Sequence, residues 1–240
     1  MKRIIAAMVA ATTLFTTAYA DNTADLVDKY INHINAPWTF SDMSGITWAA
    51  PSVDFLVSKG IVKGFEDGTF RPDNNITKAE FVKIVISSFG IFNPKAAVRL
   101  IDNTDTDWYF PYVSTALEYN IATIDENGYF NPNEYITREE MFEISKRAIS
   151  FAEISLTNKG TSITFTDEDA INPDYKASID YMSANGIVAG NPDGTLRPKA
   201  NSTRAESCVM LKRMIDSVIE NEKAVYNEVT AAPSEEAEGI

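Results

Sequence analysis

The chain has 240 residues, and 34 acidic residues against 21 basic ones give it a formal net charge of −13. So acidic a surface repels phosphate backbones, which argues against nucleic acid as a partner. The single cysteine, Cys208, excludes an intrachain disulfide. Cys208 lies where two similar helices carry apolar residues, so the sequence predicts a small buried side chain rather than a nucleophile.

Residues 1–20 have the pattern of a secretory signal peptide. Lys2 and Arg3 form a positive start, an apolar run extends from Ile4 to Phe15, and a small-x-small site ends at Ala20. A transmembrane anchor is the alternative, although the run is short and rich in threonine. We therefore expect a mature protein that begins near Asp21 and is soluble outside the membrane.

Residues 21–39 predict an amphipathic leader helix. Its apolar residues recur at helical spacing and are Leu26, Val27, Tyr30, Ile31 and Ile34. The only histidine, His33, also falls in this leader, which leaves the rest of the chain without a partner for a Cys or Ser nucleophile. No catalytic site is expected.

Three copies of one unit follow, at residues 40–90, 99–150 and 164–216. A turn glycine marks the copies at intervals of 60 and 66 residues, at Gly68, Gly128 and Gly194. A glutamate of the second helix recurs at the same two intervals, at Glu80, Glu140 and Glu206, so the interior of the unit carries no insertions. Units of about 50 residues rarely hold a core alone, and the repeat therefore predicts one body in which three copies share a core.

Each copy opens on an apolar residue two positions before an aspartate, and a first helix follows. These aspartates are Asp42, Asp102 and Asp167. The predicted apolar stripes of the first helices are Val53, Leu56 and Val57, then Val113, Ala116 and Leu117, then Ile179, Met182 and Ser183. Gly60, Asn120 and Gly186 stand where a helix C-cap favours a left-handed backbone.

A tight turn comes next, at Asp67-Gly68, Asn127-Gly128 and Asp193-Gly194. An apolar residue two positions later is expected to anchor each turn in the core, and these residues are Phe70, Phe130 and Leu196. The loops lack the acidic ligand that an EF-hand needs at its first position, where they have Lys63, Thr123 and Ala189, so no metal or other cofactor is expected.

The second helix of each copy begins with a capping box, in which Thr at the N-cap pairs with Glu at the third helical position. The pairs are Thr77 with Glu80, Thr137 with Glu140, and Thr203 with Glu206. Apolar stripes along these helices predict a central three-helix bundle. The last one is expected to run to about Glu228 within the C-terminal region 217–240, and residues 231–240 have the composition of a disordered tail.

The repeated unit has the pattern Phe-x-Asp, then Trp, then Gly-Ile-x-x-Gly-x-x-Asp-Gly-x-Phe-x-Pro, and finally Ile-Thr-Arg-Ala-Glu. This pattern resembles the S-layer homology domain. The resemblance covers about residues 40–216. It implies a mainly α fold, with helix-loop-helix repeats in a pseudo-threefold trimeric arrangement around a central three-helix bundle. It also implies non-covalent attachment of a secreted protein to the bacterial cell wall or S-layer, through grooves between copies that bind a pyruvylated secondary cell-wall polysaccharide.

The resemblance implies three kinds of ligand contact. The basic residues are Lys78, Arg138 and Arg204, the acidic ones are Asp42, Asp102 and Asp167, and the aromatic ones are Trp48 and Trp108. A cation in the first turn of a helix opposes the helix dipole, and free N–H groups there favour an anion. The cation could instead pair with an aspartate of a neighbouring copy, and the tryptophans could instead fill the core.

The copies differ at positions that bear on the site. Lys78 replaces arginine in copy one, and copy three has Asp174-Tyr175 where the others have a tryptophan. Copy two has Ile124 in place of a glycine and Asn131 in place of an arginine. A side chain at position 124 is expected to crowd a loop that elsewhere lets the backbone approach a ligand, so the three grooves should be unequal.

The leading hypothesis is a binding module that anchors itself, or another surface protein, to an anionic wall glycan. A structural protein of the S-layer or envelope and a peptidoglycan-binding module are the alternatives. A glycan hydrolase needs two carboxyl groups about 5 to 10 Å apart. The repeated carboxylates, among them Asp67 and Asp193, are already explained by turns and caps, so an enzyme is not expected.

Overall fold

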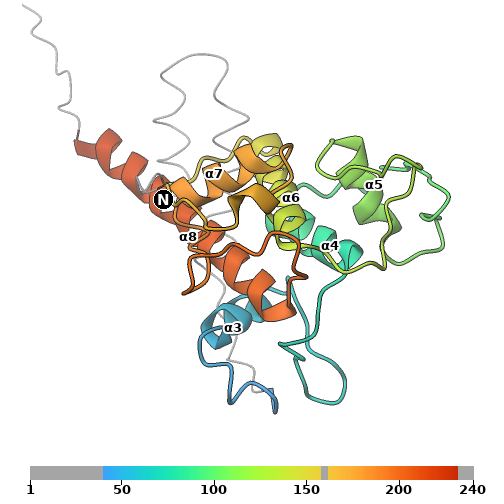
Figure 1. Ribbon diagram of the computed structural model, residues 1–240, viewed down its shortest axis with the longest axis horizontal. Helices are drawn as coiled ribbons and strands as arrows, with labels where there is room; N and C mark the ends of the chain where they lie inside the picture. Colours follow the sequence, from blue (N-terminus) through green and yellow to red (C-terminus); the bar gives the residue numbers. More distant parts are fainter. Residues whose placement is uncertain (1–39, 158–161, 232–240) are drawn as a thin grey trace, which may run out of the picture.

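The computed structural model describes residues 40–157 and 162–231. The predicted signal peptide, the leader helix and residues 232–240 of the predicted tail lie outside this part of the chain. The described residues form a mainly helical body without strands, which confirms the predicted fold class (Figure 1). None of the described helices is both long enough and apolar enough to span a bilayer.

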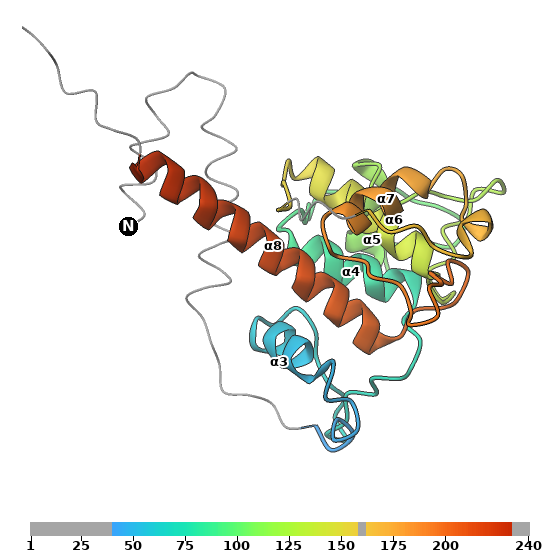
Figure 2. The same cartoon turned by 60° about the vertical axis from the view of Figure 1, so that its left-hand side comes forward.

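Each copy contributes a short first helix and a second helix. The first helices are α3 (Ala50–Ser58), α5 (Phe110–Glu118) and α7 (Lys176–Ala184). The second helices are α4 (Lys78–Ser88), α6 (Arg138–Phe151) and α8 (Arg204–Ala231), and a short 3-10 helix, η1 (Glu168–Ala170), precedes α7. The last helix extends beyond the rest of the body (Figure 2), three residues past the predicted end.

The copies pack on one another in a cyclic order. The second helix of each copy packs against the first helix of the next, so that α4 contacts α5, α6 contacts α7, and α8 returns to α3. Figure 2 shows α3 beside α8 even though the two helices lie at opposite ends of the sequence. Each first helix is therefore covered by another copy rather than by its own.

A ring of three backbone hydrogen bonds joins the copies just before their second helices. The Ile76 N–H donates to the Ser202 carbonyl, the Ser202 N–H to the Ile136 carbonyl, and the Ile136 N–H to the Ile76 carbonyl, each at 3.0 Å. All three residues are buried. Because every bond joins two different copies, the ring closes only when all three copies are in place.

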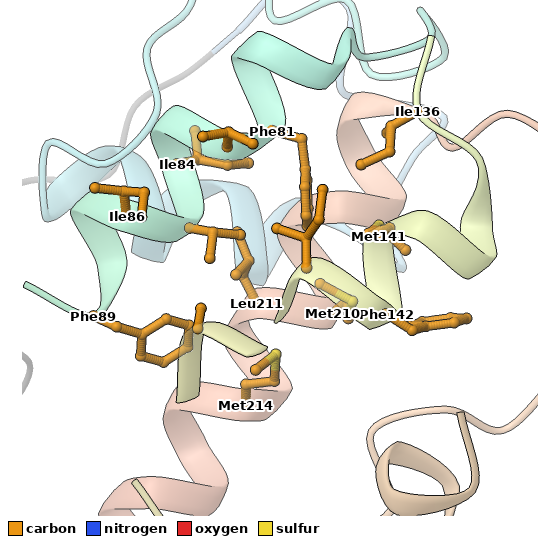
Figure 3. Close-up of a cluster of buried hydrophobic side chains, with 14 of the residues drawn as sticks. Phe81, Ile84, Ile86, Phe89, Ile136, Met141, Phe142, Met210, Leu211 and Met214 are labelled. Atoms are coloured by element: carbon orange, nitrogen blue, oxygen red, sulfur yellow. The ribbon is translucent and has the colours of Figure 1, made fainter. Parts of the chain in front are cut away.

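The core lies where the three second helices meet. Figure 3 shows buried side chains of α4, α6 and α8 that point toward one another, among them Phe81, Met141 and Leu211. The predicted stripes of the first helices are buried except for Leu117, which is partly exposed. The predicted turn anchors Phe70, Phe130 and Leu196 are buried as well.

The predicted helix boundaries are also confirmed. Both bonds of the capping box are present at Thr77 with Glu80 and at Thr137 with Glu140. Thr203 with Glu206 makes the same two bonds, at 2.9 and 3.2 Å. The C-cap residues Gly60, Asn120 and Gly186 have positive φ angles of 70°, 54° and 71°.

The glycine that copy two lacks has a packing role. A Cβ on Gly64 would lie 2.1 Å from Phe40 Cε1 and 2.9 Å from the Thr69 carbonyl oxygen. A Cβ on Gly190 would lie 2.9 Å from Phe165 Cε1. Copy two has the smaller Leu100 in place of this phenylalanine, and Ile124 is partly exposed. These glycines therefore make room for an aromatic ring of their own copy, and the expectation that they also let a ligand approach stays a prediction.

We predict that Gly64→Ala lowers the free energy of unfolding by about 1 to 3 kcal/mol, because the new methyl group overlaps the Phe40 ring. Adding Phe40→Leu, which introduces the leucine found in copy two, should recover part of this loss. Chemical denaturation of the two single variants and the double variant measures the coupling. Gly45→Ala is the matched control, since a Cβ there would meet nothing within 4 Å. Equal losses of unfolding free energy for Gly64→Ala and Gly45→Ala would contradict the packing argument.

Candidate functional site

The first turns of the second helices offer no free N–H group to an anion, which corrects the expectation from sequence. The first helical N–H groups, at Lys78, Arg138 and Arg204, donate to carbonyls of the next copy in the cycle at 2.8 to 2.9 Å. The second N–H groups donate to proline carbonyls of that copy at 3.0 Å. The third N–H groups, at Glu80, Glu140 and Glu206, donate to the hydroxyl oxygen of the N-cap threonine of the same helix. Anion binding would therefore depend on side chains.

The three predicted cations lie at the same cyclic contacts, and two of them form ion pairs. Lys78 Nζ lies 3.1 Å from Glu140 Oε1 and 3.3 Å from Glu134 Oε2. Arg138 Nη1 lies 3.1 Å from Glu206 Oε1. The partners are therefore glutamates of the neighbouring copy, and not its aspartates as the alternative from sequence supposed. Burial opposes the charge of Lys78, but Glu140 and Glu134 raise the pKa of its ammonium group overall.

Arg204 shares one bond with Arg138, because the Nε of each donates to a carbonyl of the next copy, Phe70 at 3.0 Å and Leu196 at 2.9 Å. It differs in that its Nη2 donates to the Lys63 carbonyl at 3.1 Å, whereas Arg138 pairs with Glu206. The guanidinium carbon of Arg204 lies 4.7 Å from the Phe70 ring centre and 5.0 Å from that of Phe65. No carboxylate among the described residues lies within ion-pair distance of Arg204. Burial lowers the pKa of its guanidinium group, which the more distant Glu80 opposes.

The predicted acidic residues hold the loop backbone of their own copy. The two carboxylate oxygens of Asp42 accept the Phe70 and Arg71 N–H groups at 2.9 and 2.7 Å. Asp102 accepts those of Phe130 and Asn131 at 3.3 and 2.6 Å, and Asp167 accepts those of Leu196 and Arg197 at 2.7 and 2.8 Å. This explains all three aspartates structurally, and a direct contact with a ligand stays a prediction.

The same loops contain residues with an unusual backbone. Arg71, Asn131 and Arg197 have positive φ angles of 56°, 60° and 57°, which are uncommon for residues other than glycine. Arg71 and Arg197 each pair with the turn aspartate of their own copy, Asp67 and Asp193, at 2.9 and 2.7 Å. In copy two Asn131 Nδ2 instead donates to Asp125 at 2.9 Å. The sequence pattern contained no signal for these φ angles.

Trp48 and Trp108 are on the surface and do not fill the core. Their exposed fractions are 55% and 54%. Each stands two residues before a first helix, and Lys83 Nζ of α4 lies 5.4 Å from the Trp108 ring centre, which places Trp108 beside the second helix of the previous copy. The alternative in which the tryptophans fill the core is wrong, and a contact of these rings with a sugar stays a prediction.

The interfaces therefore carry different predicted contacts. Copy three meets copy one with Arg204 and Trp48, and copy one meets copy two with Lys78 and Trp108. Copy two meets copy three with Arg138 and Asp174, without a tryptophan. Only the interface of copies three and one combines an arginine with a tryptophan.

Copy two also has a wide, open cavity of about 600 Å³ on its surface, which the sequence did not reveal. Its lining includes Asp102, Asp107, Tyr109, Tyr129, Asn131 and Glu134. Hydrogen bonds from the Thr104 backbone and hydroxyl lower the pKa of the Asp107 carboxyl group. The cavity is thus lined by carboxylates, amides and two phenol rings, where copies one and three have an arginine in place of Asn131.

Cys208 is buried, as predicted, and burial raises the pKa of its thiol to about 12. Such a thiol carries almost no thiolate at neutral pH, which rules out a nucleophilic role for this residue.

Comparison with known proteins assigns the family. The chain matches the S-layer homology domain at three tandem positions, residues 39–82, 101–142 and 164–206, which together exceed half of its length. It belongs to this family, and the predicted identification is confirmed. Its membership makes the chain a cell-surface anchoring module and places it among secreted proteins of the cell surface.

The chain is similar to part of several larger proteins. It is 27% identical over 196 residues to an endoglucanase of Bacillus sp. (strain KSM-635), a match that covers 82% of the chain and 21% of the endoglucanase. It is 27% identical over 159 residues to the cellulosome-anchoring protein of Acetivibrio thermocellus, with coverages of 65% and 35%. The match to the surface-layer 125 kDa protein of Lysinibacillus sphaericus is 27% identical over 217 residues, 89% of the chain and 18% of that protein.

The pH dependence of the turns follows from their hydrogen bonds. Bonds from the Thr195 hydroxyl, Arg197 and the Thr195 N–H lower the pKa of Asp193 to about 2. A lowered pKa means that Asp193 stabilises the fold above its unfolded pKa of about 3.8 and that this contribution is lost as the pH falls toward 2. We predict that Asp193→Asn is less stable than the wild type at pH 5 and that the difference disappears near pH 2.

Thermal unfolding across this pH range measures the effect. Thr195→Val should raise the pKa of Asp193 toward its ordinary value, as followed by carboxyl-carbon NMR, because it removes the hydroxyl donor. A pKa of Asp193 near 3.8 in the wild type would contradict the assigned role of these bonds.

Proposed function

We propose that the chain is a non-covalent cell-wall anchor that binds an anionic, pyruvylated secondary cell-wall polysaccharide, without catalysing its hydrolysis. The observation that carries the proposal is Arg204, a largely enclosed cation at the contact of copies three and one that has no carboxylate partner among the described residues. A guanidinium group pairs with a carboxylate through two parallel bonds, which suits the carboxylate of a pyruvate ketal.

The surroundings of Arg204 favour such a ligand. Phe65 and Phe70 flank its guanidinium plane, and Arg71 stacks on Phe65 at 3.8 Å. These contacts fix the orientation of the guanidinium group before a ligand arrives, which reduces the entropy lost on binding. Trp48, on the same interface between copies, offers an exposed ring to a sugar.

We infer that the other two interfaces bind the ketal less well. Glu206 already pairs with Arg138, and Glu140 and Glu134 already pair with Lys78. A ligand carboxylate would have to compete with a glutamate in each case, and the like charge of that glutamate would oppose its approach. The acidic body also repels an anionic glycan at long range, so binding relies on local contacts and should weaken only moderately with salt.

The test is co-sedimentation of the protein with purified cell-wall sacculi, before and after chemical removal of ketal pyruvate. Arg204→Gln should weaken binding at least tenfold, because it removes the positive charge and the paired donors. Removal of pyruvate should weaken binding of the wild type to the same extent and should not weaken the variant further.

Arg99→Gln is the matched control, because Arg99 is an exposed arginine paired only with Asp105. Arg138→Gln tests the ranking of the interfaces and should lose less binding than Arg204→Gln. Binding that survives removal of both pyruvate and wall polysaccharide would assign peptidoglycan as the ligand instead. Sheets or large oligomers without any wall binding would assign a structural role in the surface layer, and release of reducing sugar would assign a hydrolase.

A further inference from the structure

The open cavity of copy two is lined by residues of that copy alone, whereas Arg204 lies where copies three and one meet. The loops that form the cavity lie beside α5, on the opposite side of the body from the end of α8 that extends beyond it (Figure 1). A cavity of about 600 Å³ is within the size range of ligand pockets. Copy two therefore has a surface that the proposed glycan site does not use.

Large apolar side chains replace small polar ones at this cavity. Ile101 and Tyr129 both line it, and Ile101 is 75% exposed, the largest exposed fraction of any large hydrophobic residue in the described part of the chain. Removing such a side chain from water is favourable, so an apolar partner would gain affinity by covering it. The other copies have Ser41 and Thr166 at the first of these positions, and Thr69 and Thr195 at the second.

The charge of the loop also differs among the copies. Residues 123–135 of copy two contain three carboxylates and no cation. Residues 63–75 of copy one contain three carboxylates and two cations, and residues 189–201 of copy three contain one carboxylate and two cations. Part of the difference is Asn131, which stands where the other copies have an arginine. Copy two therefore has the most negative loop of the three.

The carboxylates of the cavity are available to a cation. Asp102 accepts backbone N–H groups and Asp107 accepts Thr104, and neither forms an ion pair with a lysine or arginine of the described residues. The lowered pKa of Asp107 keeps its carboxyl group ionised at neutral pH. These carboxylates are not grouped closely enough to hold a metal ion. A guanidinium or ammonium group, whose several N–H donors can reach separated carboxylates, fits the cavity better.

We propose that the cavity of copy two docks another surface protein, through a segment that combines lysine or arginine with apolar residues. The cation of the segment enters among the carboxylates, and its apolar residues cover Ile101 and Tyr129. The anionic glycan does not suit this surface, because the carboxylates of the cavity repel its carboxylates. The inference goes beyond the proposed function: copies three and one hold the wall, while copy two holds a protein.

The probe is a phage-displayed library of random peptides, selected on the wild-type protein and sequenced. Enriched peptides should combine lysine or arginine with apolar residues, and their affinities are then measured by calorimetry on synthetic peptides. Ile101→Ser and Asn131→Arg should each weaken binding about tenfold. The first substitution removes the apolar contact, and the second places a cation at the cavity.

Both substitutions introduce a residue that another copy already has at the same position, so the fold should be retained, which thermal unfolding checks. Position 131 has the same positive φ that Arg71 and Arg197 adopt. Ile163→Ser is the matched control, because Ile163 is 39% exposed and lies outside the cavity. Arg204→Gln tests independence from the glycan site. Both controls should leave the peptide affinity within about twofold of the wild type.

Enrichment of acidic or uncharged peptides, or no enrichment at all, would overturn the docking proposal. Cationic peptides that bind Ile101→Ser as tightly as the wild type would also overturn it, since they would report only the negative charge of the whole body. Self-association of the wild type that Ile101→Ser abolishes would assign a second copy of this chain as the occupant instead. Peptide binding that is lost equally in Ile163→Ser would reject the docking site and leave the proposed glycan site in place.

Discussion

The ring of backbone hydrogen bonds through Ile76, Ile136 and Ser202 is the constraint on which the rest of the structure depends. Buried backbone groups must find partners, and here each copy finds them only in the next one. The first turns of the second helices follow the same rule. Positions that would bind an anion in an isolated helix therefore join the copies, and recognition falls to side chains at the edge of each interface.

This arrangement makes the interfaces chemically independent of one another. The backbone bonds are the same at all three, so the side chains around them can differ without breaking the ring. Lys78 and Arg138 pair with glutamates, whereas Arg204 lies near the rings of Phe65 and Phe70. The three interfaces of a repeated fold thus carry different side chains around the same backbone bonds.

Much of the fold could be predicted because its signals are local. Capping boxes, glycines at C-caps and helical stripes each depend on residues a few positions apart, and the structure confirms them. The partners of the cations could not be predicted, because the order in which copies meet is a property of the closed ring.

The pairing of Phe40 with Gly64, and of Leu100 with Ile124, couples two positions that lie far apart along each copy. A Cβ on Gly64 would overlap the Phe40 ring, so the size of one side chain limits the size of the other. A loop moved from copy two into copy one would therefore fit best if the leucine were moved together with the isoleucine.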